Sequence, residues 1–352
     1  MKSKIALLLA AWLVAAATMA QESKGIAELA GYRGPDRERI LIEGAKNEGA
    51  LTLYTSQQLN DTNPIIEAFE KKYGIKVKVW RSGPDKVVPR IINEAKGKRF
   101  EFDVVETEGQ ALEALQREQQ LQAVKTPYLN DLVPQALRPH GEWVGTRLLV
   151  FAQAYNTNLI KKEDLPKTYQ DLADPKWKGR LGIDSKDDEW FYALVQQLGE
   201  ERGLKLFREI GANNGFSVRN GHTLLTNMVA SGEVPMALTV YNARVEQLKN
   251  KGAPIDWFVL QPAIAQVNGA AVSRHAQHPH SALLFFDFLL SDAQSILAKR
   301  DVISVSKHFS SPLSSFPFTE TDPSKLLDQG EKWTRIYQEI IGRPAQNLDN
   351  RK

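Results

Sequence analysis

The sequence predicts an α/β protein built of two lobes. Three observations lead to this fold class: a strand–helix–strand unit over residues 48–80, a second alternating series that begins at Leu181, and two long β-rich segments between the series. Strands that alternate with helices are typical of sheets covered by helices. With 352 residues, 42% of them hydrophobic and 25% charged, the chain is long enough for two cores.

The first unit begins with an apolar, strand-forming run that contains Leu51 and Leu53 and ends at the polar turn 55–58. Polar residues 60–63 offer helix N-caps, and Pro64 follows at a position where the first turn tolerates proline. The helix is expected to end at Gly74, and a second strand follows over 75–79. Such units place their strands parallel, and ligands bind beyond the carboxyl ends, so the turn is expected at a binding site.

Later segments complete both lobes. Helices are expected over 36–47, 87–95, 111–119, 190–198 and 331–341, and strands over 102–106, 181–183, 216–218 and 234–240. The segments 143–158 and 255–272 are expected to cross between the lobes, with hinges near Val150 and Gln261. The expected division is an N-terminal segment with a helix (21–47), lobe one (48–150 plus 266–352), and lobe two with the hinge crossings (151–265).

The first twenty residues have the pattern of a secretory signal peptide. Lys2 and Lys4 precede an apolar run, and cleavage is expected after Ala20. Removing the two lysines takes the formal charge from +3 to +1, which gives no case for nucleic-acid binding. The chain has no cysteine, which excludes a lipid-modified cysteine, disulfides and thiolate metal sites. A soluble periplasmic protein is expected.

Seven segments, taken in order, resemble one protein family. They are GAKNEGALTLYTSQ (44–57), IIEAFEKKYGIKV (65–77), DVVETEG (103–109), YNTNLI (155–160), SGEVPMAL (231–238), GAPIDWFVLQPAI (252–264) and HPHSALLFFDFLLS (278–291). The chain resembles the periplasmic solute-binding proteins of ABC importers, in the branch with the ferric-ion-binding proteins and their relatives for phosphorylated or carboxylated molecules. The resemblance implies a two-lobe clamshell of type II with two hinge crossings, each lobe a mixed sheet flanked by helices.

Loops at strand ends supply the candidate ligand residues, because loops on a rigid scaffold carry function more often than helices do. Each candidate also has a simpler role, as a solvated polar group or a helix cap. The candidates from lobe one are Thr55, Ser56, Gln57, Gln58, Ser82, Lys86, Thr107 and Glu108. Those from lobe two are Ser185, Lys186, Arg219, Asn220, His222, Tyr241 and Asn242.

The iron pattern of the resembled branch is incomplete in this sequence. Its members typically bind iron with two adjacent tyrosines, often adding a histidine and a carboxylate, and hard ferric iron selects anionic oxygen donors. Here the pair reads Tyr241-Asn242, the turn after the first strand has no histidine, and Glu108 is the carboxylate that matches. An iron site would therefore need an exogenous anion, and the departure favours an organic anion as the solute.

The charges of the loops leave the sign of the ligand open. Lys86, Lys186, Arg219 and His222 suit phosphate or carboxylate groups, and helix N-termini add free amides. The acidic residues Glu106, Glu108, Asp187 and Asp188 would suit a cation if they face the cleft.

Two further groups have simpler structural explanations. His275, His278 and His280 have no recurrent metal spacing and are expected in a surface loop. Trp177 and Trp257 are expected in packing, whereas Trp190 is kept as a candidate for ligand stacking because it follows the 184–189 loop.

The sequence thus predicts a periplasmic, monomeric substrate-binding component of an ABC import system, without a cofactor. It is expected to close around a small anionic organic solute (phosphorylated, phosphonate or carboxylate) and deliver it to an inner-membrane permease and ATPase. One alternative is ferric-iron transport through Tyr241, Glu108 and an exogenous anion, and another is a ligand-presenting sensor module. An enzyme is not expected, since no G-x-S-x-G, P-loop or H-E-x-x-H motif occurs.

Overall fold

The computed structural model describes residues 25–300, 302–310 and 317–342. The expected signal peptide and its cleavage after Ala20 lie outside these residues. The chain forms two compact units. Unit 1 comprises Met1–Arg147, Asn268–Leu297 and Ser304–Phe309, and unit 2 comprises Leu148–Val267, Ala298–Ile303 and Ser310–Lys352.

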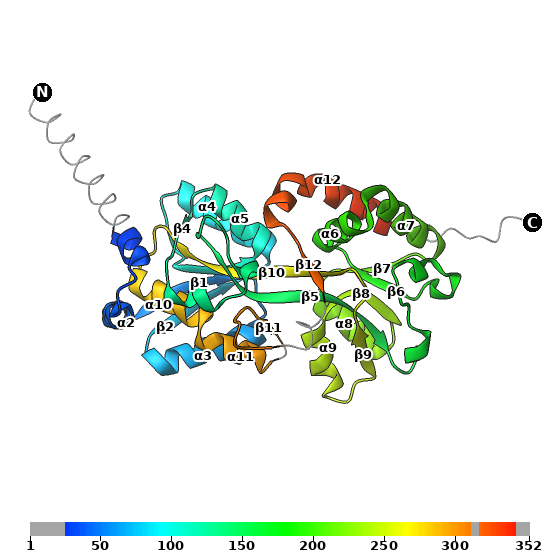
Figure 1. Ribbon diagram of the computed structural model, residues 1–352, viewed down its shortest axis with the longest axis horizontal. Helices are drawn as coiled ribbons and strands as arrows, with labels where there is room; N and C mark the ends of the chain where they lie inside the picture. Colours follow the sequence, from blue (N-terminus) through cyan, green and yellow to red (C-terminus); the bar gives the residue numbers. More distant parts are fainter. Residues whose placement is uncertain (1–24, 301, 311–316, 343–352) are drawn as a thin grey trace, which may run out of the picture. The chain divides into compact units, whose positions relative to one another are not determined.

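Unit 1 is a sheet with helices on both faces (Figure 1). Strand β1 pairs in parallel with β2 and β3, and β3 pairs antiparallel with the later part of β10. The elements that belong to it are α2 (Arg37–Glu48), β1 (Ala50–Thr55), α3 (Leu59–Tyr73), β2 (Lys76–Arg81), α4 (Pro84–Lys96), β3 (Val104–Glu108), α5 (Gly109–Arg117), β4 (Leu121–Gln122), η1 (Pro127–Asp131), η2 (Pro134–Ala136), α10 (Pro279–Leu290) and most of α11 (Asp292–Ala298).

The helices of unit 1 begin and end where their sequence dictates. Gly74 adopts φ 74° after α3 and its amide bonds the carbonyl of Glu70, a left-handed helix end that glycine adopts without strain. Helix α3 begins at Leu59, before the polar residues 60–63 that were expected to cap it, and Pro64 lies inside the helix. Its buried face includes Phe69, which packs edge-on against Phe285 of α10, with the ring centroids 4.9 Å apart.

The N-terminus of α10 is capped by carboxylates from distant parts of unit 1. Glu48 accepts hydrogen bonds from the amides of His280 and Ser281 at 3.0 and 2.7 Å, and from Nδ1 of His280 at 2.7 Å. Asp103 does the same for His278, through its amide at 2.9 Å and Nδ1 at 2.8 Å. These bonds satisfy amides that a helix start leaves unpaired.

Unit 2 is a second sheet covered on both faces. Strand β6 pairs in parallel with β7 and β8, and β8 pairs antiparallel with β5. The elements that belong to it are η3 (Lys162–Asp164), η4 (Gln170–Ala173), η5 (Pro175–Trp177), β6 (Leu181–Asp184), α6 (Asp188–Leu198), α7 (Glu200–Asn213), β7 (Ser217–Arg219), α8 (His222–Ser231), β8 (Met236–Tyr241), α9 (Asn242–Lys249), β9 (Ile255–Phe258), β12 (Phe318–Glu320) and α12 (Pro323–Ile341).

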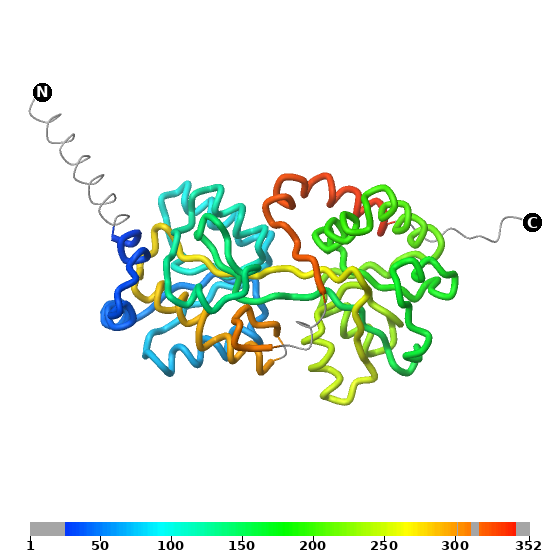
Figure 2. Tube along the Cα trace, in the orientation of Figure 1, coloured from blue at the N-terminus to red at the C-terminus, as the bar shows by residue number. Residues whose placement is uncertain are grey.

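Three strands lie across the boundaries between the units. They are β5 (Val144–Asn156), β10 (Ala263–Ser273) and the short β11 (Ile303–Ser304). The first two can be followed as single stretches of the trace in Figure 2. Hinges were expected near Val150 and Gln261. The boundaries between the two units fall after Arg147, within β5, and after Val267, within β10.

Alternation along β8 divides the core of unit 2 between two faces. Met236 and Leu238 belong to one cluster with residues of α6, α7 and α12, whereas Ala237 and Val240 belong to another with residues of α8 and α9. Successive strand side chains point to opposite faces, so a fully apolar strand is buried on both. Trp190 is completely buried and packs edge-on against Phe207, so the expectation that it stacks on a ligand is wrong.

The C-terminal segment differs from its expected place. Residues after 310 were expected in lobe one, but Ser310–Lys352 belongs to unit 2, where α12 packs on α6 and α7 (Figure 2). The helix is also longer than the expected 331–341, because Asp322 caps it and Pro323 starts it. Its Trp333 and Tyr337 are fully buried against Phe191.

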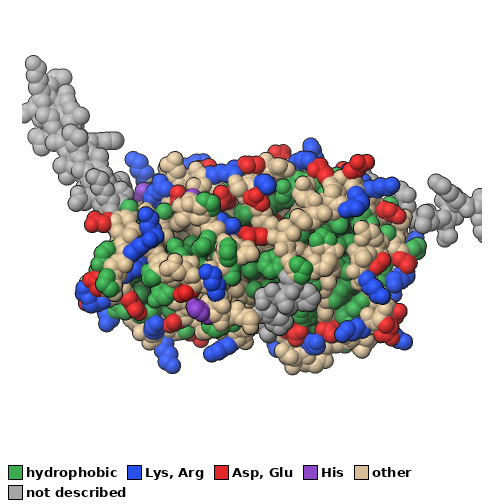
Figure 3. Space-filling model, in the orientation of Figure 1, with side chains coloured by type: hydrophobic (Ala, Val, Ile, Leu, Met, Phe, Trp, Pro, Cys, Tyr) green, Lys and Arg blue, Asp and Glu red, His purple; other side chains and the backbone are tan. Residues whose placement is uncertain are grey.

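The surface carries mixed charge. On the face drawn in Figure 3, positive and negative side chains are interspersed over both units. Within the described residues, no single helix is long and apolar enough to cross a membrane, although α10 and α11 together pass that test as a pair bent by 43°.

Candidate functional site

The candidate loops of unit 1 lie at one edge of its sheet. The register pairs Thr55 with Arg81 and with Glu106, so the carboxyl ends of β1, β2 and β3 lie together. Helices α3, α4 and α5 start at this edge, after the N-cap residues Gln58, Gly83 and Glu108. Each of these three helix N-termini carries the positive end of a helix dipole, which favours an anion here.

Contacts among the candidates hold these loops. Ser56 Oγ and Thr107 Oγ1 are 2.8 Å apart, and Thr55 Oγ1 accepts a bond from the Gln57 amide at 3.0 Å. Arg81, which was not among the candidates, donates through Nε to the Gln57 carbonyl at 3.3 Å. Thr55, Gln57 and Thr107 are buried, and Ser56, Ser82 and Glu108 are half-buried, whereas Gln58 and Lys86 are exposed.

Glu106 is committed to a buried ion pair. Its Oε1 lies 2.6 Å from the guanidinium of Arg147 and accepts a bond from Thr146 at 3.1 Å, and both charged side chains are almost wholly buried. Leaving either charge unpaired in the interior would cost several kcal/mol, on the order of 3–5. Glu106 therefore stabilises unit 1 as the partner of Arg147.

In unit 2 the last residue of each parallel strand carries a polar side chain. These residues are Asp184 of β6, Arg219 of β7 and Tyr241 of β8. Helices α6, α8 and α9 start just beyond them, so this edge is built like the one in unit 1.

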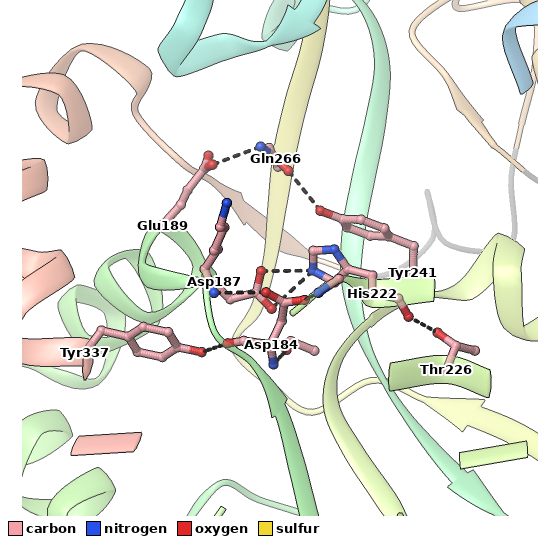
Figure 4. A network of polar contacts seen from close by, with 11 residues as sticks. Asp184, Asp187, Glu189, His222, Thr226, Tyr241, Gln266 and Tyr337 are labelled. Carbon is pink, nitrogen blue, oxygen red and sulfur yellow. Dashed lines mark hydrogen bonds and ion pairs between the residues drawn. The ribbon is translucent and has the colours of Figure 1, made fainter. Parts of the chain in front are cut away.

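The loop after β6 is fixed by Asp184. Its carboxylate accepts bonds from the amides of Lys186 at 2.9 Å and Gly221 at 2.6 Å. Burial, and then the nearby charge of Asp187, raise the pKa of Asp184 above its ordinary value. Helix α12 supports the same loop, since the Tyr337 hydroxyl donates to the Asp184 carbonyl (Figure 4).

A ring stack connects this loop to the end of β8. The buried carboxylate of Asp187 lies 2.9 Å from Nε2 of His222, and the imidazole lies against Tyr241 with ring centroids 4.5 Å apart (Figure 4). Phe151 of β5 packs on the Tyr241 ring at 5.4 Å. The aromatic body of Tyr241 is therefore held from two sides.

The hydroxyl of Tyr241 is held by a second chain of contacts. It donates to Gln266 Oε1 at 3.0 Å, and Gln266 Nε2 donates to Glu189 Oε2 at 2.9 Å (Figure 4). The other oxygen of Glu189 accepts a bond from Thr321. This polar chain joins β8, β10, α6 and the segment after β12.

The other candidates of unit 2 have separate positions. Ser185 and Asn220 lie in the loops after β6 and β7, Lys186 is exposed, and Asn242 is the first residue of α9. Arg219 does not join the Tyr241 network. Its guanidinium contacts Met228 Sδ at 3.1 Å and lies 3.7 Å from Glu233. The expected anion contact through Arg219 stays a prediction.

Gln266, Glu189 and Thr321 belong to this network but were not among the residues expected at the site. Gln266 did carry a signal, because it is a polar residue, 6% exposed, within the mostly apolar and wholly buried strand β10. A buried amide needs partners, so its neighbours should be polar as well. Glu189 and Thr321 gave no comparable signal, since both lie at or near helix starts where acidic residues and threonine are ordinary.

The three histidines near α10 form no metal centre. Within the described residues, no group of three or more His, Cys, Asp or Glu side chains could hold a metal ion. His278 and His280 take part in the caps of α10, and His275 stacks on Phe100 with centroids 4.1 Å apart. His275 and His280 also line a cavity of about 900 Å³ in unit 1, and no candidate ligand residue lines it.

The fold and the loops at its strand ends define a solute-binding protein with the periplasmic-binding-protein fold. Residues 64–301 match the family described as bacterial extracellular solute-binding protein, and the chain belongs to it. The expected fold class and family are thereby confirmed, and membership places the chain among transport proteins rather than enzymes.

Similar proteins carry the names of iron-binding proteins. Iron uptake protein A1 of Synechocystis sp. is 31% identical over 76% of this chain and 78% of its own length. The Major ferric iron-binding protein of Neisseria meningitidis serogroup B is 25% identical over 82% of this chain and 92% of its own length. The crystal structure of iron-bound HitA from Pseudomonas aeruginosa is 28% identical in sequence and has a TM-score of 0.72. The match covers 83% of this chain and 99% of the HitA chain.

Proposed function

We propose that this chain is the periplasmic substrate-binding component of an ABC import system and that its cargo is ferric iron. It would deliver the cargo to an inner-membrane permease driven by an ATPase. The names of the relatives support iron over the organic anion that the sequence favoured, because Iron uptake protein A1 and iron-bound HitA are both similar to this chain over most of its length.

The placement of Tyr241 is the observation that carries the proposal. Its phenol stands at the carboxyl end of β8, in a network that also contains the carboxylates of Asp187 and Glu189. Ferric iron is a hard cation that selects anionic oxygen donors such as phenolate and carboxylate. Glu108, at the carboxyl end of β3 in unit 1, is proposed as a second oxygen donor.

Asn242 occupies the position where the resembled pattern has a second tyrosine, so the protein supplies one phenolate fewer. We therefore propose that an exogenous anion completes the iron coordination. The helix N-termini at both strand edges support this, because the positive ends of the helix dipoles favour negative charge.

A second candidate cargo is a small phosphorylated, phosphonate or carboxylate compound. Two observations favour it: Asn242 in place of a phenol, and the hydroxyl of Tyr241 engaged as a donor to Gln266. Both suit hydrogen bonding to an organic solute.

The test is a titration of metal-free protein with ferric citrate, followed by the visible phenolate-to-iron charge-transfer band. The proposal expects the band in the wild type, its loss in Tyr241→Phe, and its retention in Tyr155→Phe, a buried tyrosine of β5 outside the site. Absence of the band in the wild type, together with calorimetric binding of an organic phosphate, would favour the second candidate.

A further inference from the structure

Tyr241, Gln266 and Glu189 form a relay whose direction is fixed by chemistry. The Tyr241 Oη to Gln266 Oε1 distance is 3.0 Å, and the Gln266 Nε2 to Glu189 Oε2 distance is 2.9 Å. The three residues come from β8, β10 and the first turn of α6, so separate elements of unit 2 hold them in place (Figure 4).

The carboxylate end determines the orientation of the amide. An ionised carboxylate only accepts hydrogen bonds, whereas an amide has a donor end and an acceptor end. Gln266 therefore points Nε2 at Glu189 and its carbonyl oxygen at Tyr241. Facing a carbonyl, the Tyr241 hydroxyl has to donate its proton in this bond, so towards a cargo its oxygen acts as an acceptor.

Burial strengthens this constraint. Gln266 is 6% exposed, and the second oxygen of Glu189 is engaged by Thr321. Turning the amide would place its carbonyl oxygen against the Glu189 carboxylate in a site with little water, where such a contact is costly.

We propose that Glu189 is a specificity-determining residue that, through Gln266, holds the Tyr241 hydroxyl as a hydrogen-bond donor. The effect on iron rests on the proposed function. When a Tyr241–iron bond forms, the O–H bond breaks, the proton goes to bulk water, and Gln266 has to turn so that Nε2 donates to the phenolate. Glu189 opposes that turn and so weakens iron binding relative to solutes that leave the hydroxyl protonated.

In Glu189→Gln nothing opposes the turn of the Gln266 amide, because the new amide at position 189 can pair with Gln266 in either orientation. Hydrogen bonds to charged groups are stronger than those between neutral groups, so ferric affinity is expected to rise by about tenfold or more. Glu201→Gln is the matched control, since Glu201 is an exposed residue in the first turn of α7.

The first measurement needs no cargo. Ultraviolet resonance Raman spectra distinguish a tyrosine hydroxyl that donates from one that accepts, and subtraction of the Tyr241→Phe spectrum isolates Tyr241. We expect a donor signature in the wild type and in Glu201→Gln, and a shift towards the acceptor signature in Glu189→Gln. An unchanged Glu189→Gln spectrum overturns the proposal, whatever the cargo is.

The second measurement is the ferric citrate titration of the same proteins, with thermal melting to confirm that each is folded. A higher affinity in Glu189→Gln alone supports the proposal, and an equal or lower affinity overturns it. If no variant binds iron, the proposed cargo is wrong, and the Raman spectra alone then decide whether Glu189 controls Tyr241.

Discussion

The imidazole of His222 lies against the ring of Tyr241, with centroids 4.5 Å apart and planes inclined by 38°. Nε2 of the same imidazole lies 2.9 Å from Asp187, whose carboxylate is buried. Asp187 therefore acts on the position of Tyr241 without touching it.

Replacing Asp187 by alanine should weaken cargo binding. His222 would lose its partner at Nε2, a loss of about 1–3 kcal/mol, and part of this would appear as reduced affinity, up to about tenfold. Ferric titration with the charge-transfer band measures the effect. Asp187→Asn should recover most of the affinity because its carbonyl oxygen still accepts from Nε2. Full affinity in Asp187→Ala would contradict the positioning role.

Replacing Arg219 by alanine should leave cargo affinity within about twofold of the wild type. Its guanidinium is engaged by Met228 and lies 3.7 Å from the exposed Glu233, and surface ion pairs of this kind contribute about 0–1 kcal/mol. Calorimetry with iron and with an organic phosphate checks this. A tenfold loss for either ligand would restore Arg219 as a ligand residue.

Replacing Glu48 by glutamine should destabilise the protein in a pH-dependent way. Burial opposes ionisation of Glu48, but hydrogen bonds from His280 and from the α10 amides outweigh it and lower the pKa of this carboxyl below its usual value. A carboxyl whose pKa is lowered in the folded state stabilises the fold at pH values above its unfolded-state pKa. That contribution is lost as the pH falls through the folded-state pKa.

At pH 7 we expect Glu48→Gln to lower the free energy of unfolding by about 1 kcal/mol, which is typical of a lost helix cap. This difference from the wild type should shrink below about pH 4.5. Urea unfolding at several pH values measures it, with the exposed Glu67→Gln of α3 as the control. A penalty independent of pH would show that ionisation of Glu48 does not stabilise α10.

Replacing Trp333 by alanine should destabilise unit 2 by about 3–5 kcal/mol, the usual cost of truncating a large buried aromatic side chain. Trp333 is fully buried, 6.1 Å from Phe191 between ring centroids. Urea unfolding of this variant and of the exposed neighbour Lys332→Ala provides the comparison. Equal stability of the two variants would mean that α12 does not complete the core of unit 2.

The pattern of the sequence predicted the fold well where periodicity was strong. The β1–α3–β2 unit follows from an apolar strand, a helical stripe ending at Gly74 and an alternating strand. The place of α12 was not predictable in this way. Trp333 and Tyr337 mark one face of the helix as buried, but nothing local to them says which unit supplies Phe191 as a partner.

The candidate site was predictable to the level of loops but not of side-chain direction. Parallel strands bring their carboxyl ends together, so Thr55 and Tyr241 could be nominated from strand ends alone. Arg219 ends a strand as well, yet its long side chain turns to Met228. Gln266 escaped because it lies within a strand that passes the site rather than ending there.

Native mass spectrometry of the protein isolated gently from the periplasm, compared with its denatured mass, tests most directly whether ferric iron is the cargo. We predict an excess mass equal to one ferric ion with a small anion, and loss of that excess in Tyr241→Phe. An excess that matches an organic phosphate or carboxylate without iron, retained in Tyr241→Phe, would contradict this prediction.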